Sequence, residues 1–95
     1  MSVKDAYVKK VQAKMEEWHA EIERLKAKAD EAEADAQLEY YKHVGKLRSL
    51  HNSASDKLAH LKEAGDEAWE DLKHGVDSAW EDLSRSLKSA VDKFR

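Results

Sequence analysis

At two places in the chain a glutamate lies one helical turn before a histidine. Carboxylate and imidazole side chains can both ligate a metal ion. The first pair, Glu16 and His19, forms a Glu-x-x-His motif, the spacing that supplies ligands in di-iron helical bundles. The motif occurs once, and His19 follows Trp18 at the flank of an apolar seam. A solvated helix face carrying Glu16 and His19 is therefore the simpler interpretation.

The second pair, Glu39 and His43, lies near the middle of the chain beside Tyr40 and Tyr41. Copies of His43 that meet in an antiparallel assembly would bind copper, zinc or iron through neutral imidazoles, or repel one another once protonated. The other interpretation is a ring packed at the seam edge, with its nitrogen on Glu39 or water. The sequence thus requires no cofactor, and a transition metal is kept as an alternative.

The remaining residues with catalytic potential show no convergent pattern. His51, His60 and His74 share no spacing and are expected on the surface. The chain has no cysteine, which excludes a thiolate nucleophile, a disulfide and a cysteine-bound metal. It has neither a glycine-rich phosphate loop nor a paired nucleophile and base. We therefore expect a protein that is not an enzyme.

The elements that carry these residues are long helices. From Leu47 to Phe94 apolar residues recur at steps of three, four and four, a repeat of eleven residues that keeps a helical seam straight or slightly right-handed. The repeat is visible as identity, because Ala-Trp-Glu-Asp-Leu at 68–72 recurs at 79–83. A degenerate third copy occupies 90–94.

The first part of the chain follows a different period. From Val11 to Ala36 the apolar steps alternate between four and three, as in a heptad seam. The later seam positions, within 27–36, are alanines that allow close helix approach. A single domain over 1–95 is predicted, with a heptad part at about 7–36 and an eleven-residue part at about 43–94.

The position of a turn is open between three alternatives. One is a break near 64–66, where Gly65 suits a helix end and Asp66 suits the next cap. Another is 51–56, which is rich in poor helix formers. The third is one continuous helix, because the apolar phase crosses both places without a reset. We favour the break near Gly65, with a second helix from about Asp66 to Phe94.

Composition limits the partners. The chain has 95 residues, 39% of them charged, no proline, and three isolated glycines. Such a short, polar chain is not expected to form a compact core alone, so other copies should supply the packing surface. The net charge of −3 is spread evenly along the chain, which argues against nucleic acid binding. No leader or membrane span is visible, so a cytoplasmic location is expected.

The C-terminal segment also permits a membrane-surface alternative. Trp69 and Trp80 lie on a strongly amphipathic helix, and eleven-residue repeats occur in helices that lie on lipid. The polar face of this segment is acidic, however, and anionic lipid headgroups would repel it. Packing of the tryptophans against another helix is therefore favoured.

Several segments together resemble a known group of proteins. They are the Asp-Ala-Tyr start at 5–7, the heptads over 18–36 with Lys-Ala-Lys-Ala-Asp at 26–30, and the repeated Ala-Trp-Glu-Asp-Leu. The chain resembles small bacterial coiled-coil proteins described as stress-response proteins. That resemblance implies a soluble bacterial protein and carries no catalytic residue. The chain departs from the pattern at Asn52 and Ser53, in a stretch where better helix formers are expected.

The sequence thus predicts an all-α protein, a helical hairpin or single extended helix, that assembles into a coiled coil or four-helix bundle. The expected partner is a second copy of the chain, and other proteins are an alternative partner. The expected role is structural or protective. The predicted interface residues are Trp18, Ile22, Leu25, Leu58, Leu61, Trp69, Leu72, Val76, Trp80, Leu83 and Phe94.

Overall fold

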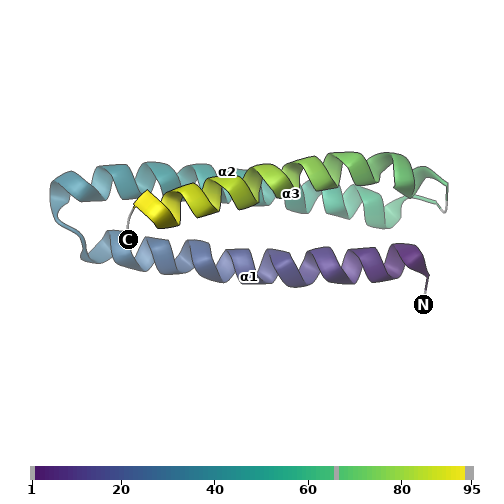
Figure 1. Ribbon diagram of the computed structural model, residues 1–95, viewed down its shortest axis with the longest axis horizontal. Coiled ribbons are helices and arrows are strands. Elements are labelled where there is room, and N and C mark those ends of the chain that lie inside the picture. The colour runs from purple at the N-terminus through teal and green to yellow at the C-terminus, as the bar shows by residue number, and fades with distance from the viewer. Residues whose placement is uncertain (1, 66, 94–95) are drawn as a thin grey trace.

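Three long helices form an up-down-up bundle in the computed structural model, which describes residues 2–65 and 67–93 (Figure 1). The helices are α1 (Val3–Glu31), α2 (Ala34–Glu63) and α3 (Ala68–Lys93). The bundle measures 51 × 19 × 18 Å. Helix α2 runs antiparallel to both of its neighbours, so α1 and α3 run in the same direction.

The all-α class is confirmed, but the expectation of one or two helices is wrong, because the chain also turns at Ala32 and Glu33. Both residues have extended backbone, with ψ of 159° and 154°. The run 30–35 is rich in acids, which are unfavourable at the end of one helix and favourable at the start of the next. Its alanines bury little apolar area, and so a helix gains little by continuing. The apolar period alone does not reveal this turn.

The second turn lies between Glu63 and Ala68 and includes Gly65, the residue at which we favoured a break. Helix α2 passes through 51–56 without interruption. Helix α3 begins at Ala68 instead of Asp66. The capping role expected of Asp66 and the seam position of Phe94 both fall on residues that the structure leaves undescribed.

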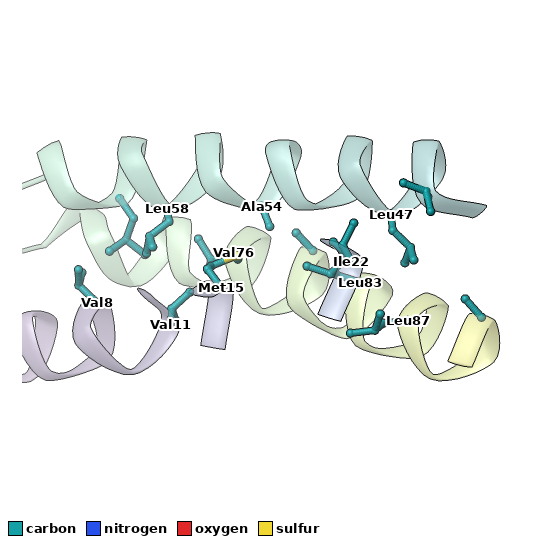
Figure 2. Close-up of a cluster of buried hydrophobic side chains, with 14 of the residues drawn as sticks. Val8, Val11, Met15, Ile22, Leu47, Ala54, Leu58, Val76, Leu83 and Leu87 are labelled. Carbon is teal, nitrogen blue, oxygen red and sulfur yellow. The ribbon is translucent and has the colours of Figure 1, made fainter. Parts of the chain in front are cut away.

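The apolar stripes of the three helices meet along the bundle axis and form one core (Figure 2). The expectation that this chain cannot build a compact core alone is therefore wrong. The two turns fold the stripe back on itself, so that it buries against its own chain. Within the described residues no polar or charged side chain is buried. The core residues with the lowest exposure are Val11, Ile22, Ala29, Leu47, Ala54, Leu61, Val76, Leu83 and Ala90.

Polar contacts fasten one end of the bundle. Ser2 caps α1, because its hydroxyl accepts a hydrogen bond from the Asp5 backbone N–H at 3.1 Å. The ammonium group of Lys4 donates to the carbonyl oxygens of Lys62 and Ala64, at 2.9 and 2.6 Å. A cation is thereby placed at the carbonyl end of α2, where the helix dipole favours positive charge.

The opposite end of the bundle is fastened by side chains from all three helices. Tyr41 donates a hydrogen bond to the Asp30 carboxylate at 2.6 Å, across the turn between α1 and α2. The ammonium group of Lys93 lies 3.3 Å from the Glu39 carboxylate, which joins the end of α3 to α2. These contacts hold the ends of the helices level with one another.

Candidate functional site

Two aromatic contacts set the register between α1 and α3. The rings of Tyr7 and Trp69 have centroids 5.9 Å apart, and those of Trp18 and Trp80 meet edge to face at 5.0 Å. Tyr7 and Trp18 are eleven residues apart in α1, as are Trp69 and Trp80 in α3. The repeat of eleven therefore continues across the interface between these parallel helices.

These rings also keep α1 and α3 apart. Close backbone approaches join α2 to α1 and to α3, whereas α1 and α3 make few of them. Large aromatic side chains occupy the space between the parallel pair, and their bulk increases the distance between the helix axes. As a result the α1–α3 side is the open side of the bundle.

An open groove begins where the aromatic contacts end. One further step of the same register sets Ala29 level with Val91, and these side chains are smaller than the rings of the two preceding steps. The groove has a volume of about 720 Å³, within the range of ordinary ligand pockets. Its lining residues are Glu17, Trp18, Ala20, Glu21, Arg24, Ser84, Leu87, Lys88, Val91 and Asp92.

The groove has an apolar floor and a charged rim. Trp18 and Val91 are half-buried on the floor, next to the buried side chain of Leu87. The α1 rim carries Glu17 and Arg24, whose side chains are 64% and 65% exposed. An apolar centre surrounded by a polar rim is the usual anatomy of a protein–protein interface.

The α1 rim charges already have partners within the chain. Glu17 pairs with Lys14 at 3.1 Å, and Arg24 pairs with Glu21 at 2.7 Å. Exposed pairs of this kind within one helix contribute only a few tenths of a kcal/mol. These charges can therefore exchange partners at small cost when another surface approaches.

A polar contact also joins α1 to α3 in a separate hollow, nearer the start of α1 than the groove. The Tyr7 hydroxyl donates to the Asp77 carboxylate at 2.6 Å, and the Lys73 ammonium lies 5.4 Å from the centre of the Tyr7 ring. Burial, and then the hydrogen bond to the Asp77 carboxylate, raise the pKa of Tyr7 far above its ordinary value. Tyr7 is thus a neutral hydrogen-bond donor that ties α1 to α3.

Most of the predicted interface residues lie in the core of the single chain. Those buried there are Ile22, Leu25, Leu58, Leu61, Trp69, Val76 and Leu83. Trp18 and Trp80 are partly buried along the α1–α3 side. Leu72 is 40% exposed, although it continues the apolar period. The apolar face of α3, on which the membrane alternative rested, is turned into the bundle.

The predicted metal ligands do not converge. His43 lies 4.0 Å from Glu39, whose carboxylate also pairs with Lys93. The hydrogen bond from Lys93 lowers the pKa of Glu39. His19 and Glu16 are exposed. Over residues 2–65 and 67–93, no three His, Asp or Glu side chains are placed to hold a metal ion.

One pair of histidines comes together that the sequence did not indicate. The rings of His19 and His51 have centroids 5.8 Å apart across α1 and α2, and His51 Nε2 lies 3.0 Å from the Met15 carbonyl oxygen. His51 is partly buried by this contact. Its position depends on how two helices pack, which spacing along the chain does not reveal.

Sequence reasoning also missed part of the groove. It placed Leu87 and Val91 in the seam but assigned no role to the rim residues Glu17, Arg24 and Lys88. These residues are ordinary charged positions on a helix, and they become a site only when α1 and α3 are held side by side. One feature of the sequence could have indicated the groove: Tyr7 and Trp18 have the same spacing of eleven residues as Trp69 and Trp80.

Comparison of the chain with protein-family models, curated proteins and solved structures finds no match. None of the described helices is long and apolar enough to cross a bilayer.

Proposed function

We propose that this chain is a non-enzymatic helical-bundle protein that self-associates through the groove between α1 and α3, in a structural or protective role. The half-buried Trp18 on the floor of an open groove is the observation that carries the proposal. Tryptophan is enriched at the energetic centres of protein interfaces, where its large ring loses contact with water. Leu87 and Val91 extend the apolar area beside it.

A second copy suits this face in size. A long side of the bundle measures 51 by about 18 Å, and each partner in a standard interface contributes roughly 800 Å². Outside the groove, the exposed large apolar side chains Val3, Leu38, Tyr41 and Leu72 are scattered over the three helices. Copies of the chain therefore offer one another the groove face, and the contact is groove to groove.

Self-association of this kind joins units that are already folded. The core is completed within one chain, and the groove adds a further surface to it. Helicity should therefore stay constant on dilution while the molecular mass falls. A chain that needed partners in order to fold would lose both together.

Matched serine substitutions test the proposal. Ser84 is exposed in the groove, and Ser53 is exposed on α2 away from the groove. Ser84→Glu places a charge in the apolar contact and should weaken association roughly tenfold or more. Ser53→Glu should leave association unchanged.

The masses and helicities of the two variants decide the outcome. If both variants have the helicity of the unmodified chain and only Ser84→Glu has a lower mass, the result supports the groove as the contact. Equal effects of both substitutions would overturn it, and so would an unmodified chain that stays monomeric at every concentration.

A further inference from the structure

We infer that two copies pack antiparallel about a two-fold axis perpendicular to the helices, so that Glu17 pairs with Arg24 of the second copy and Asp77 pairs with Lys88 of the second copy. The inference rests on the proposed self-association and specifies its register. It follows from how charged residues are spaced on the α1–α3 side of the bundle.

The two-fold axis lies in the plane of contact and crosses the helices at right angles. It sets each helix against the same helix of the second copy, running in the opposite direction. A residue at some distance on one side of the axis then faces the residue at the same distance on the other side. Favourable pairing requires opposite charges at equal distances from one point on each helix. The two helices supply independent tests of that condition.

On α1 the condition is met by Glu17 and Arg24. Their midpoint lies between residues 20 and 21, and both side chains line the groove. Ala20 and Glu21 flank this midpoint. Ala20 is small and permits close approach of the second copy, and the Glu21 carboxylate, which meets its own copy near the axis, is neutralised by Arg24 of its own chain at 2.7 Å. Each two-fold contact therefore contains the pair twice, once in each direction.

On α3 the same condition is met by Lys88, which lines the groove, and by Asp77, which lies beyond the groove and accepts the Tyr7 hydrogen bond through one oxygen of its carboxylate. Their midpoint lies between residues 82 and 83, and the pair Glu81 and Arg85 centres on residue 83. Both pairs lie along the α1–α3 side or beside it. A second helix thus shows opposite charges arranged symmetrically about one point.

The two midpoints lie at the same height in the bundle. Trp18 is level with Trp80, and each midpoint lies two to three residues beyond its tryptophan. At 1.5 Å of rise per residue, both midpoints are about 4 Å past the ring contact. A single axis therefore brings opposite charges together on α1 and on α3, although the charged residues of the two helices follow different sequence patterns.

The opposite orientation has unfavourable charges. An axis parallel to the helices would set α1 against α3 of the second copy at equal heights. In the register fixed by the aromatic contacts, Lys88 of the second copy would then lie within two residues of the height of Arg24, and both side chains line the groove. Like charges so close in height disfavour that arrangement.

The antiparallel register also keeps a large overlap. Its axis lies between three and four residues from the centre of α1, so the two copies are offset by roughly 10 Å at 1.5 Å of rise per residue. About 40 Å of the 51 Å face remains covered. This overlap corresponds to roughly 700 Å² for each copy, close to the contribution expected in a standard interface.

Two complementary charge reversals test the register. Glu17→Arg gives a chain with arginine at both α1 positions, and Arg24→Glu gives a chain with glutamate at both. Each variant alone sets like charges together twice and should dimerise at least tenfold more weakly than the unmodified chain. An equimolar mixture sets arginine against glutamate at both contacts and should recover the original mass.

A matched control separates this pairing from general attraction between oppositely modified chains. Asp56→Arg and Lys57→Glu make the same changes of net charge at exposed positions on α2. Each of these should dimerise like the unmodified chain, alone or mixed.

These results distinguish a failure of the antiparallel register from a failure of the proposed self-association. Dimers that are insensitive to Glu17→Arg and Arg24→Glu overturn the antiparallel register and leave the proposed self-association standing. Control variants that each dimerise weakly alone and regain dimerisation when mixed, as the test pair is expected to do, also overturn the register. An unmodified chain that forms no dimer at any concentration overturns both the register and the proposed self-association.

Discussion

The indole ring of Trp18 meets that of Trp80 edge to face, with centroids 5.0 Å apart, between two helices that run in the same direction. This contact does two things. It sets the register of α1 against α3, and it holds them far enough apart for a groove to open beyond it. The core and the candidate site therefore depend on the same pair of side chains.

Replacing Trp18 by alanine should lower the free energy of unfolding by about 2–3 kcal/mol, because the ring is partly rather than fully buried. Trp80→Ala should cost a similar amount. The double variant should show a coupling of about 0.5–1.5 kcal/mol from the edge-to-face contact. Urea unfolding at concentrations where the chain is monomeric measures all three. Strictly additive effects would contradict a direct ring contact.

Lys4→Met should destabilise the bundle by about 1 kcal/mol, because the ammonium group donates to two carbonyl oxygens at the end of α2. Thermal unfolding measures the loss, which should shrink at high salt. Lys9→Met, at an exposed position on the same helix, is the control. Equal effects of the two substitutions would show that general charge, and not the helix end, matters.

Glu33→Pro should stabilise the protein by about 0.4–1 kcal/mol. Glu33 already has φ of −64°, and the preceding Ala32 has the extended backbone that proline requires of its neighbour. Ser53→Pro should instead cost about 3 kcal/mol or more, because Ser53 lies inside α2. Urea unfolding of both variants locates the turn, and the reverse order of stabilities would place it at 51–56.

The pKa of Asp30 should depend on Tyr41. The hydrogen bond from the Tyr41 hydroxyl, helped by Lys26, lowers the pKa of Asp30 below its ordinary value of 3.8. A carboxyl group with a lowered folded pKa stabilises the fold above the unfolded pKa, and this contribution is lost as the pH falls through the folded value. Carboxyl NMR titration should therefore show the pKa of Asp30 rising in Tyr41→Phe. Tyr7→Phe, at the far end of the bundle, should leave it unchanged.

Helical periodicity predicted much of the core in advance. Ile22, Leu61 and Leu83 were placed in the apolar seam by spacing alone, and all three are buried. Spacing reports which side of a helix is apolar, and that side is buried whether the partner helix comes from the same chain or another. The source of the partner was therefore the part that spacing left undetermined.

The first turn and the groove were harder to predict. The apolar phase runs through Ala32 without a shift, and the turn there follows from acidic and small residues that also suit a continuous helix. The groove depends on the pairing of Trp18 with Trp80, two residues from distant parts of the sequence. Their equal spacing from Tyr7 and Trp69 was visible, but it gains meaning only once α1 and α3 are known to be parallel.

The most direct test of self-association is the mass of the unmodified chain by sedimentation equilibrium over a wide range of concentrations. The structure leads us to expect a mass that rises from 10.9 kDa toward twice that value, while circular dichroism shows constant helicity. A mass that stays at 10.9 kDa at every concentration would contradict the proposal that the groove between α1 and α3 joins two copies.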